Sequence, residues 1–549
     1  MSSIHTPSPK SPENEKIKRY DRQLRLWGEN GQLALETSHV CLINANVVGT
    51  EILKNLVLPG IRAFTIIDDQ TVTEDDVDSN FFLWPEESIG QSRAKVAAHF
   101  LLEMNEDVKK GDYIQEKFEI LLEKDLDFFK NFTLVIACGI CDEDSLNKLS
   151  RKLWSINVPL LVAKSIGFLG YIRLQIEEHP VLEPHPDNSL DDLRLDHLFP
   201  ELQSYFDSFP NFDCLDRTEL SRIPSLVIIY RNLLKWREHY QKSANTIPTN
   251  YSEKSELISL IKTNMFELKD RFVALELENF EEAIKLANKI FYDSDRIPDN
   301  LRKLLAEANR RDSKLTINSN FWTMVKALND FLTIYDGHLP LNGSIPDMNS
   351  GSEQYIRLQK IYKQKAKDDV NRLQQILQDN YKTIAISDFD INLFCKNVRN
   401  LIVLRTGPMF DDIFNKSMRL LAAKNLQNCT DEEDSDSDIL RFYILMRLID
   451  RFYSKHRRFP GQNDDEVDVS ELKREFRDFC QDLGSHIVIN DESFHEICRY
   501  GGCELHSVSA FLGGCAAQEA IKIITSQYVP IDNTFVYNGL SGTTFTYKI

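Results

Sequence analysis

The chain lacks the sequence features that would take it into or across a membrane. Its apolar runs are strand-length and interrupted by charges, so none reaches the roughly 20 residues of a membrane-spanning helix. The first 18 residues are polar and rich in proline and serine, without an apolar signal-peptide core. Positive charge is also in deficit, because 84 acidic residues face 65 lysines and arginines, for a net charge of −19. We therefore expect a cytosolic or nuclear protein that binds neither nucleic acid nor membrane and favours basic partner surfaces.

The ten cysteines of the chain form neither a disulfide pattern nor a zinc pattern. They are scattered, and many lie within apolar segments. The one C-x-x-C pair is Cys138 and Cys141, whereas a zinc site would need a second pair. We interpret the cysteines as buried thiols of a reducing compartment, with a redox role for this pair as the alternative.

Two glycines are missing from a nucleotide-binding turn. The segment VCLINANVVGTEIL at residues 40–53 has the outline of the first strand–turn–helix of a Rossmann-type domain. A working turn has the pattern G-x-G-x-x-G, whose second glycine lets the phosphates approach the backbone. Here Asn44 and Asn46 hold the first two positions and only Gly49 remains. Asparagine tolerates a positive φ, but its side chain would fill the space where phosphates meet the helix N-terminus. The fold is thus predicted to persist with a damaged ATP seat.

Strands and helices alternate through the first third of the chain, which is typical of a doubly wound, mostly parallel α/β sheet. The patterns predict strands at 39–44, 62–68, 132–137 and 158–164, and helices at 15–37, 47–58, 91–104 and 142–155.

The rest of the chain changes character twice. Helical patterns dominate residues 177–485, which also hold the acidic run DEEDSDSD at 431–438, typical of a solvated loop. Beyond them the sequence predicts a strand at 486–490, a helix at about 504–525, and strands at 534–538 and 543–548. The predicted architecture is a disordered tail at 1–14 and one α/β domain in two parts, 15–176 and 486–549, split by the helical insertion 177–485.

Three motifs near the N-terminus resemble the activating enzymes of ubiquitin and ubiquitin-like modifiers, whose bacterial relatives are MoeB and ThiF. They are YDRQLRLWG at residues 20–28, EILKNLVLPGI at 51–61 and IID at 66–68. The resemblance implies a Rossmann-like, ThiF/MoeB-type adenylation domain. It makes Asp68 the remnant of a ribose-binding carboxylate, although an aspartate after a strand is ordinarily a cap or turn residue.

One branch of that family is most similar: the regulatory subunits of the heterodimeric enzymes that activate the Rub (Nedd-eight) modifier in neddylation. The similar segments are INAN at 43–46, IPTNYSEK at 247–254, ELH at 504–506, GGCAAQE at 513–519 and NTFVYN at 533–538. The resemblance covers most of residues 15–549. It implies a regulatory subunit whose partners are a catalytic subunit and the modifier, with adenylation and thioester formation carried out by the catalytic subunit.

Positions that carry charge in the active members of the family are replaced here. Ser79 stands where they have a phosphate-contacting arginine, Gln91 where they have a phosphate-binding lysine, and Ile140 where they have an aspartate that helps to hold Mg²⁺. Adenylation needs such groups to stabilise charge on the α-phosphate and the leaving pyrophosphate. The resemblance therefore implies that this chain binds no cofactor or metal, and that ATP and Mg²⁺ lie in the partner.

One residue of the first motif is a candidate for chemistry. In MoeB-like dimers the arginine of Y-x-R-Q reaches the ATP of the other subunit, and by resemblance that residue is Arg22. A long, permanently charged fork suits this contact in trans. The ordinary alternative is a surface ion pair with a nearby acid such as Asp21, and Arg25 is the second candidate.

Activating enzymes also carry a cysteine that accepts the modifier as a thioester. The insertion offers Cys214, Cys395, Cys429 and Cys480. Cys429 precedes a threonine, as such cysteines do in the family, but the acids after it would raise its thiol pKa, which disfavours the nucleophilic thiolate. We expect an insertion that resembles a catalytic-cysteine domain without its cysteine and serves as a scaffold.

Two other functions stay open at this stage. A nicotinamide-dependent oxidoreductase would need an intact dinucleotide fingerprint, and the sequence has no second one. A pure adaptor would use the insertion for docking and take no part in adenylation. The small-residue helix at 507–517 is likewise open between a subunit interface and ordinary packing on its own sheet.

Overall fold

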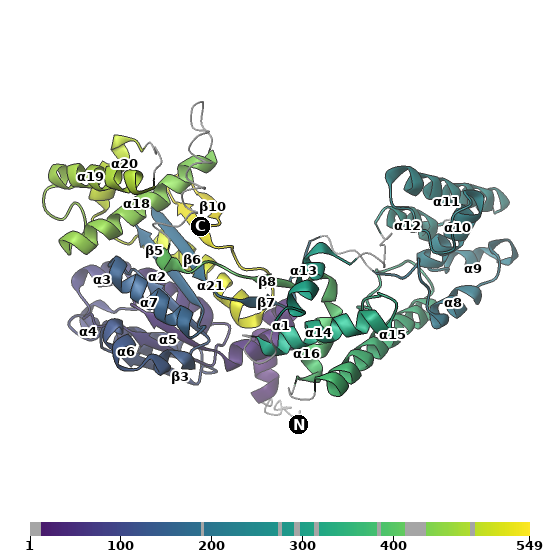
Figure 1. Cartoon of the computed structure of the whole chain (residues 1–549), viewed down its shortest axis with the longest axis horizontal. Helices are drawn as coiled ribbons and strands as arrows, with labels where there is room; N and C mark the ends of the chain where they lie inside the picture. The colour runs from purple at the N-terminus through teal and green to yellow at the C-terminus, as the bar shows by residue number, and fades with distance from the viewer. Residues whose placement is uncertain are drawn as a thin grey trace, which may run out of the picture. The chain divides into compact units, whose positions relative to one another are not determined.

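The computed structural model of the chain describes residues 12–187, 192–272, 277–289, 297–311, 318–381, 386–411, 435–483 and 489–549. These residues form two compact units (Figure 1). One unit holds the chain up to His179 together with Val403–Ile549, and the other holds Pro180–Ile402. None of the described helices is long and apolar enough to cross a membrane.

The first unit is built on an eight-stranded sheet in the order β10-β9-β6-β5-β4-β1-β2-β3. Strands β3, β2, β1, β4 and β5 are parallel, and β6, β9 and β10 add antiparallel pairings at one side. The strands are β1 (His39–Ile43), β2 (Ala63–Ile67), β3 (Lys110–Ile114), β4 (Leu134–Cys138), β5 (Leu160–Ile166), β6 (Leu169–Gln175), β9 (Thr534–Asn538) and β10 (Thr543–Tyr547). Two short strands, β7 (His179–Val181) and β8 (Ile402–Leu404), pair with each other. The predicted mainly parallel α/β sheet is confirmed.

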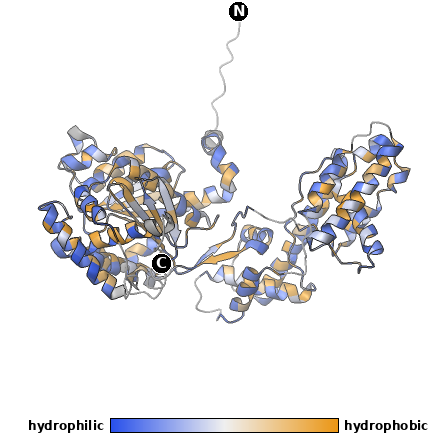
Figure 2. Ribbon diagram, turned by 90° about the horizontal axis from the view of Figure 1, so that it is seen from above, coloured by the Kyte–Doolittle hydropathy of each residue, from blue (hydrophilic) through white to orange (hydrophobic). Residues whose placement is uncertain are grey.

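Helices cover both faces of this sheet because successive strand residues point to opposite sides. Val40 and Leu42 of β1 pack into a core with α1, α2, α5 and α21. Cys41 and Ile43 of the same strand pack into the opposite core, with α6, α7, α18, α19 and α20. The central strands β1, β2 and β4 are accordingly mostly apolar and buried, and the sheet holds much of the orange in its unit (Figure 2). This double cover is what a buried parallel sheet requires.

The helices of this unit have the following bounds: α1 (Pro12–Thr37), α2 (Val47–Val57), α3 (Glu74–Ser79), α4 (Pro85–Ser88), α5 (Arg93–Glu103), α6 (Phe118–Lys124), α7 (Glu143–Ser155), α18 (Ser435–His456), α19 (Asp465–Leu483), α20 (Asp491–Tyr500) and α21 (His506–Thr525), with 3₁₀ turns at Leu126–Asn131 and Met409–Asp411.

The second unit is mainly helical, and one apolar core in it packs α8, α9, α10, α11 and α12 against α15. Its helices are α8 (Pro200–Asp207), α9 (Arg217–Ser221), α10 (Ser225–His239), α11 (Tyr251–Arg271), α12 (Glu278–Ala287), α13 (Asp299–Ala308), α14 (Ser319–Ile334), α15 (Ser352–Asn380) and α16 (Asp388–Lys396), with 3₁₀ turns at Phe212–Cys214 and Val398–Asn400. Trp236 of α10 and Tyr362 of α15 are among its largest buried side chains.

The structure divides the chain differently from the sequence boundaries. The predicted insertion runs to residue 485, but the compact helical unit ends at Ile402. Helices α18 and α19 belong to the sheet-containing unit, because their apolar faces share a core with β4 and β5. Helix α1 begins at Pro12, inside the predicted tail at 1–14. Residues 1–11, the acidic residues 431–434 and most of the predicted strand 486–490 lie outside the described residues.

The small-residue helix α21 packs within its own unit. A Cβ atom added to Gly513 would lie 2.8 Å from the Cβ of Glu51 and 3.2 Å from the backbone nitrogen of Ile52. Glycine at this position therefore lets α21 approach α2 closely. This face of the helix therefore packs inside its own unit, against α2.

We expect Gly513→Ala to destabilise the sheet-containing unit by about 1–3 kcal/mol, because α2 and α21 must move apart. Gly514→Ala is the matched control, since no atom lies within 4 Å of its added Cβ. That change should instead stabilise the helix by roughly 0.5–1 kcal/mol through helix propensity. Thermal unfolding of the two variants measures the difference, and equal melting temperatures would contradict the close approach.

Candidate functional site

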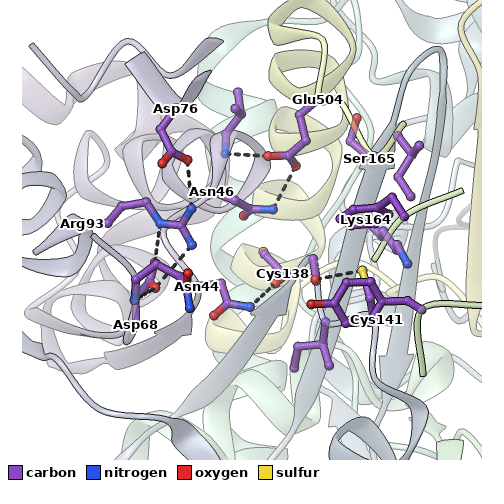
Figure 3. A pocket seen from close by; sticks show the side chains of 18 of the residues that line it. Asn44, Asn46, Asp68, Asp76, Arg93, Cys138, Cys141, Lys164, Ser165 and Glu504 are labelled. Atoms are coloured by element: carbon purple, nitrogen blue, oxygen red, sulfur yellow. Dashed lines mark hydrogen bonds and ion pairs between the residues drawn. The ribbon is translucent and has the colours of Figure 1, made fainter. Parts of the chain in front are cut away.

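A cavity of about 1050 Å³ opens where the parallel strands end. Asn44 and Asn46 follow β1, Asp68 follows β2, Gly139 follows β4, and Ser165 lies near the end of β5, all lining it (Figure 3). The carboxyl edge of a doubly wound sheet is where such folds bind nucleotides. A nucleotide site of such a fold would therefore lie in this cavity.

The degraded loop keeps the backbone course of a glycine turn. Asn44 has a left-handed φ of 66°, and its Nδ2 donates to the carbonyl of Cys138 at 2.9 Å. Asn46 is the N-cap of α2, and its Oδ1 accepts from the backbone N–H of Gly49 at 3.1 Å. An asparagine thus supplies the positive φ of the missing first glycine, and the second asparagine caps the helix.

Another side chain occupies the N-terminus of α2. Glu504 lies directly before α21, and its Oε2 accepts from the backbone N–H of Val47 at 2.9 Å. Its Oε1 accepts from Nδ2 of Asn46 at 2.9 Å (Figure 3). A helix N-terminus presents free N–H groups and a positive dipole end, which is where phosphates bind in nucleotide folds. In this chain the side-chain carboxyl group of Glu504 fills that position.

Burial raises the pKa of Glu504 to about 7, and the Val47 N–H and the charge of Arg93 only partly offset it. Because the folded pKa lies above the unfolded value of 4.5, the folded state favours the proton. The contribution of this proton to the free energy of unfolding is therefore full below about pH 4.5 and is lost as the pH rises through 7.

We expect Glu504→Gln to remove this pH dependence. Between pH 5 and pH 8 the parent should lose about 1–2 kcal/mol relative to the variant, a value reduced from the full shift because the cavity leaves the carboxyl partly accessible to water. Urea unfolding of both proteins at four pH values measures it. A stability difference that stays constant across this range would contradict the raised pKa.

Asp68, the expected remnant of the ribose-binding carboxylate, is held by groups of this chain. Its Oδ2 accepts from the backbone N–H of Ala45 at 2.9 Å and from Nε of Arg93 at 2.7 Å. Arg93 also donates to Asp76 at 2.9 Å. Both carboxylates are thereby neutralised, so Asp68 caps the turn as its ordinary interpretation expects.

Two of the three replaced charge positions line the cavity. Ser79 ends α3 and Ile140 follows β4, both lining the cavity, while Gln91 is exposed just before α5. Cys138 and Cys141 are buried free thiols, and burial raises the pKa of Cys141 to about 11. Within the described ranges, no group of three His, Cys, Asp or Glu side chains could hold a metal ion.

Arg22 lies on an anchored turn of α1 but is itself exposed. Tyr20 is buried and donates to Asp107 at 2.9 Å, and Gln23 donates to the carbonyl of Pro59 at 3.2 Å. Asp21, the alternative partner of Arg22, pairs instead with Arg25 at 3.1 Å. Across the described part of the chain, no hydrogen bond or ion pair holds the Arg22 side chain. Its backbone is fixed while its guanidinium stays available.

The candidate cysteines of the insertion differ in environment. Cys214 is exposed, Cys480 is half-buried, and Cys395 is buried, which raises its thiol pKa. Cys429 lies outside the described residues. Cys480 belongs to α19 of the sheet-containing unit and not to the second unit.

Two contacts of the site were not predicted from the sequence. Glu504 belongs to the ELH motif at 504–506 and Arg93 to the predicted helix at 91–104, but the sequence patterns assigned neither one a partner. Glu504 reaches Asn46 across 458 residues of chain, and neither hydrophobic periodicity nor motif spacing encodes such a pairing. The one available signal was the pair of missing glycines, which implies that something else fills the seat.

The ThiF family matches this chain over residues 20–549. The chain is 41% identical to the NEDD8-activating enzyme E1 regulatory subunit of Danio rerio, over 98% of this chain and 99% of that protein. It is 41% identical to the protein of the same name from Drosophila melanogaster, over the full length of both. It is 38% identical to the NEDD8-activating enzyme E1 regulatory subunit AXR1 of Arabidopsis thaliana, over 95% of this chain and 94% of that protein.

Proposed function

Because this chain belongs to the ThiF family, and within it to the NEDD8-activating enzyme E1 regulatory subunits, we propose that it is the non-catalytic half of a heterodimeric adenylating enzyme. Its partner is a catalytic subunit, and the substrate of the pair is a NEDD8-like modifier. The observation that carries this proposal is the filled seat at the N-terminus of α2, where Glu504 accepts from Val47 and Asn46. Since a side chain of this protein occupies the position where phosphates bind, we assign ATP binding to a second chain.

ATP and Mg²⁺ therefore belong to the partner in this proposal. Arg93 neutralises Asp68 and Asp76, and Ile140 offers Mg²⁺ no ligand. Apart from the guanidinium of Arg22, the charges that adenylation requires come from the catalytic subunit, which also provides the cysteine that forms the thioester. We keep the cytosol and nucleus as the proposed locations of the pair.

Arg22 is the one residue of this chain that we assign to the chemistry. Its anchored neighbours Tyr20 and Gln23 hold its backbone, and Asp21 is engaged by Arg25, which supports a guanidinium free to reach another chain. A guanidinium fork binds phosphate oxygens with two donors, and it does so best where water is excluded. The proposed role is to stabilise charge on the partner's ATP during adenylation.

Complex formation tests the pairing itself. Mixed with the catalytic subunit of a NEDD8-activating enzyme, this chain should form a one-to-one complex, measured by size-exclusion chromatography with light scattering. With ATP and modifier added, a thioester should appear on the partner's cysteine and on none of this chain's. Two separate monomers, or a thioester on this chain, would overturn the proposal.

A further inference from the structure

We propose that Glu504 is the specificity-determining residue that keeps nucleotide phosphates off this chain, because its carboxylate takes the anion seat at the N-terminus of α2. The inference rests on the proposed function, in which only the partner binds ATP. In this proposal nucleotide is excluded because Glu504 occupies the N-terminus of α2, and not because the glycines are lost.

The seat itself is intact in geometry. Asn44 adopts the left-handed φ that the first glycine of a phosphate-binding turn would adopt. The backbone at Gly49 lies close to the turn, since a Cβ added to Gly49 would lie 2.6 Å from the carbonyl oxygen of Asn44. Helix α2 follows with 11 residues, so its N-terminus carries the positive end of a full helix dipole. The turn and helix have therefore not collapsed where the glycines were lost.

The donors at this seat are used by Glu504. The backbone N–H of Val47 and the amide of Asn46 both point at its carboxylate, each at 2.9 Å. Arg93 lies close enough to favour the ionised form of Glu504. Without the carboxylate, these donors and this positive charge would face an open cavity of about 1050 Å³. Such a combination binds an oxyanion.

The backbone on either side of Glu504 is anchored, which keeps this residue beside the N-terminus of α2. The backbone N–H of Gly167 donates to the carbonyl of Cys503 at 2.7 Å. His506 contacts the buried carboxylate of Glu51 at 3.1 Å and packs at a tilt of 31° against Phe81, with ring centroids 3.8 Å apart. Glu504 thus sits between two anchored neighbours, and its position does not depend on a bound nucleotide.

The test is a titration of inorganic phosphate into the full chain, followed by phosphorus NMR and calorimetry. The parent protein should show no saturable binding. Glu504→Ala should gain saturable phosphate binding, with an affinity at least about tenfold above the detection limit at which the parent shows none, because it opens the seat and removes its negative charge. Glu504→Gln still fills the space and should bind no more tightly than the parent. Glu504→Ser, which also opens the seat, replaces the alanine variant if that one fails to fold.

Asp78→Ala is the matched control, because it removes one exposed carboxylate that lines the same cavity and leaves α2 plugged. It should leave phosphate binding unchanged. Equal gains in Asp78→Ala and Glu504→Ala would trace the effect to overall charge and overturn the proposal, as would a folded, open-seat variant that binds no phosphate. The titration needs no partner, so its failure leaves the heterodimer proposal standing, while a failed heterodimer would leave the titration result unchanged.

Discussion

Replacing Arg22 with alanine should lower the modifier-dependent ATP–pyrophosphate exchange of the heterodimer by about 10²–10³-fold. The reason is that a guanidinium placed against developing phosphate charge acts mainly in the transition state, where it is preorganised and shielded from water. The fold should not change, because Arg22 is exposed and the anchoring of the turn comes from Tyr20 and Gln23. Steady-state exchange measured with saturating partner, ATP and modifier gives the number.

Lys18→Ala is the matched control for this experiment. Lys18 lies one helical turn before Arg22 on α1 and is exposed. Its removal takes away one positive charge and leaves the pair of Arg25 with Asp21 in place, so exchange should change by less than about twofold. Arg22→Lys should recover only part of the activity, because an ammonium group cannot form the two parallel bonds of the fork. An Arg22→Ala heterodimer with unchanged exchange would contradict the role in trans and favour the adaptor alternative.

Replacing Asp450 with alanine should destabilise the sheet-containing unit by about 3–5 kcal/mol. Asp450 of α18 and Lys164 of β5 form an ion pair, and both side chains are about 1% exposed. Arg447 also donates to Asp450, at 3.0 Å. Removal of the carboxylate leaves a buried ammonium without its partner, which costs much more than the pair contributes. Differential scanning calorimetry of the full chain should show this loss in the transition of that unit.

Asp112→Ala is the matched control, because Asp112 pairs with Lys110 on the exposed edge strand β3. Its loss should cost no more than about 1 kcal/mol. The double change Lys164→Met with Asp450→Leu should recover most of the stability, since it removes the two partners together while Arg447 keeps its ion pair with Glu143 at 3.0 Å. A melting curve of Asp450→Ala that matches the parent would mean that α18 is not held to the sheet by this pair.

The parts of the fold that follow hydrophobic periodicity could be predicted from the sequence. The continuous apolar runs at residues 39–44 and 132–137 became β1 and β4, because strands buried on both faces need apolar residues throughout. The edge strand β3 escaped prediction, since its residues are half-exposed and its sequence KGDYI carries no apolar alternation. The strand β6 also escaped, because it follows β5 directly without the crossover helix that marks a parallel pair.

Domain boundaries were harder to predict than elements. The sequence of α18 has the same helical pattern as the helices of the insertion. Only the residues that pack against α18 place it on the sheet. Those partners include Lys164, which is 286 residues away. Local patterns report the face of a helix that is buried, but not the surface that buries it.

The candidate site divides in the same way. The missing glycines predicted a damaged nucleotide seat, and the structure supplies the group that fills it. Glu504 and Asn46 meet only because α21 returns to lie along α2. The sequence likewise does not show that Asp21 pairs with Arg25 and not with Arg22.

The most direct measurement is ATP–pyrophosphate exchange dependent on a NEDD8-type modifier, run with this chain alone and then with the catalytic partner. We predict no exchange by the chain alone, because Glu504 occupies the phosphate seat and Arg93 neutralises Asp68. Exchange should appear when the partner is added. Exchange by this chain alone would mean that Asn44 and Asn46 accommodate ATP, and that the chain is an enzyme in its own right.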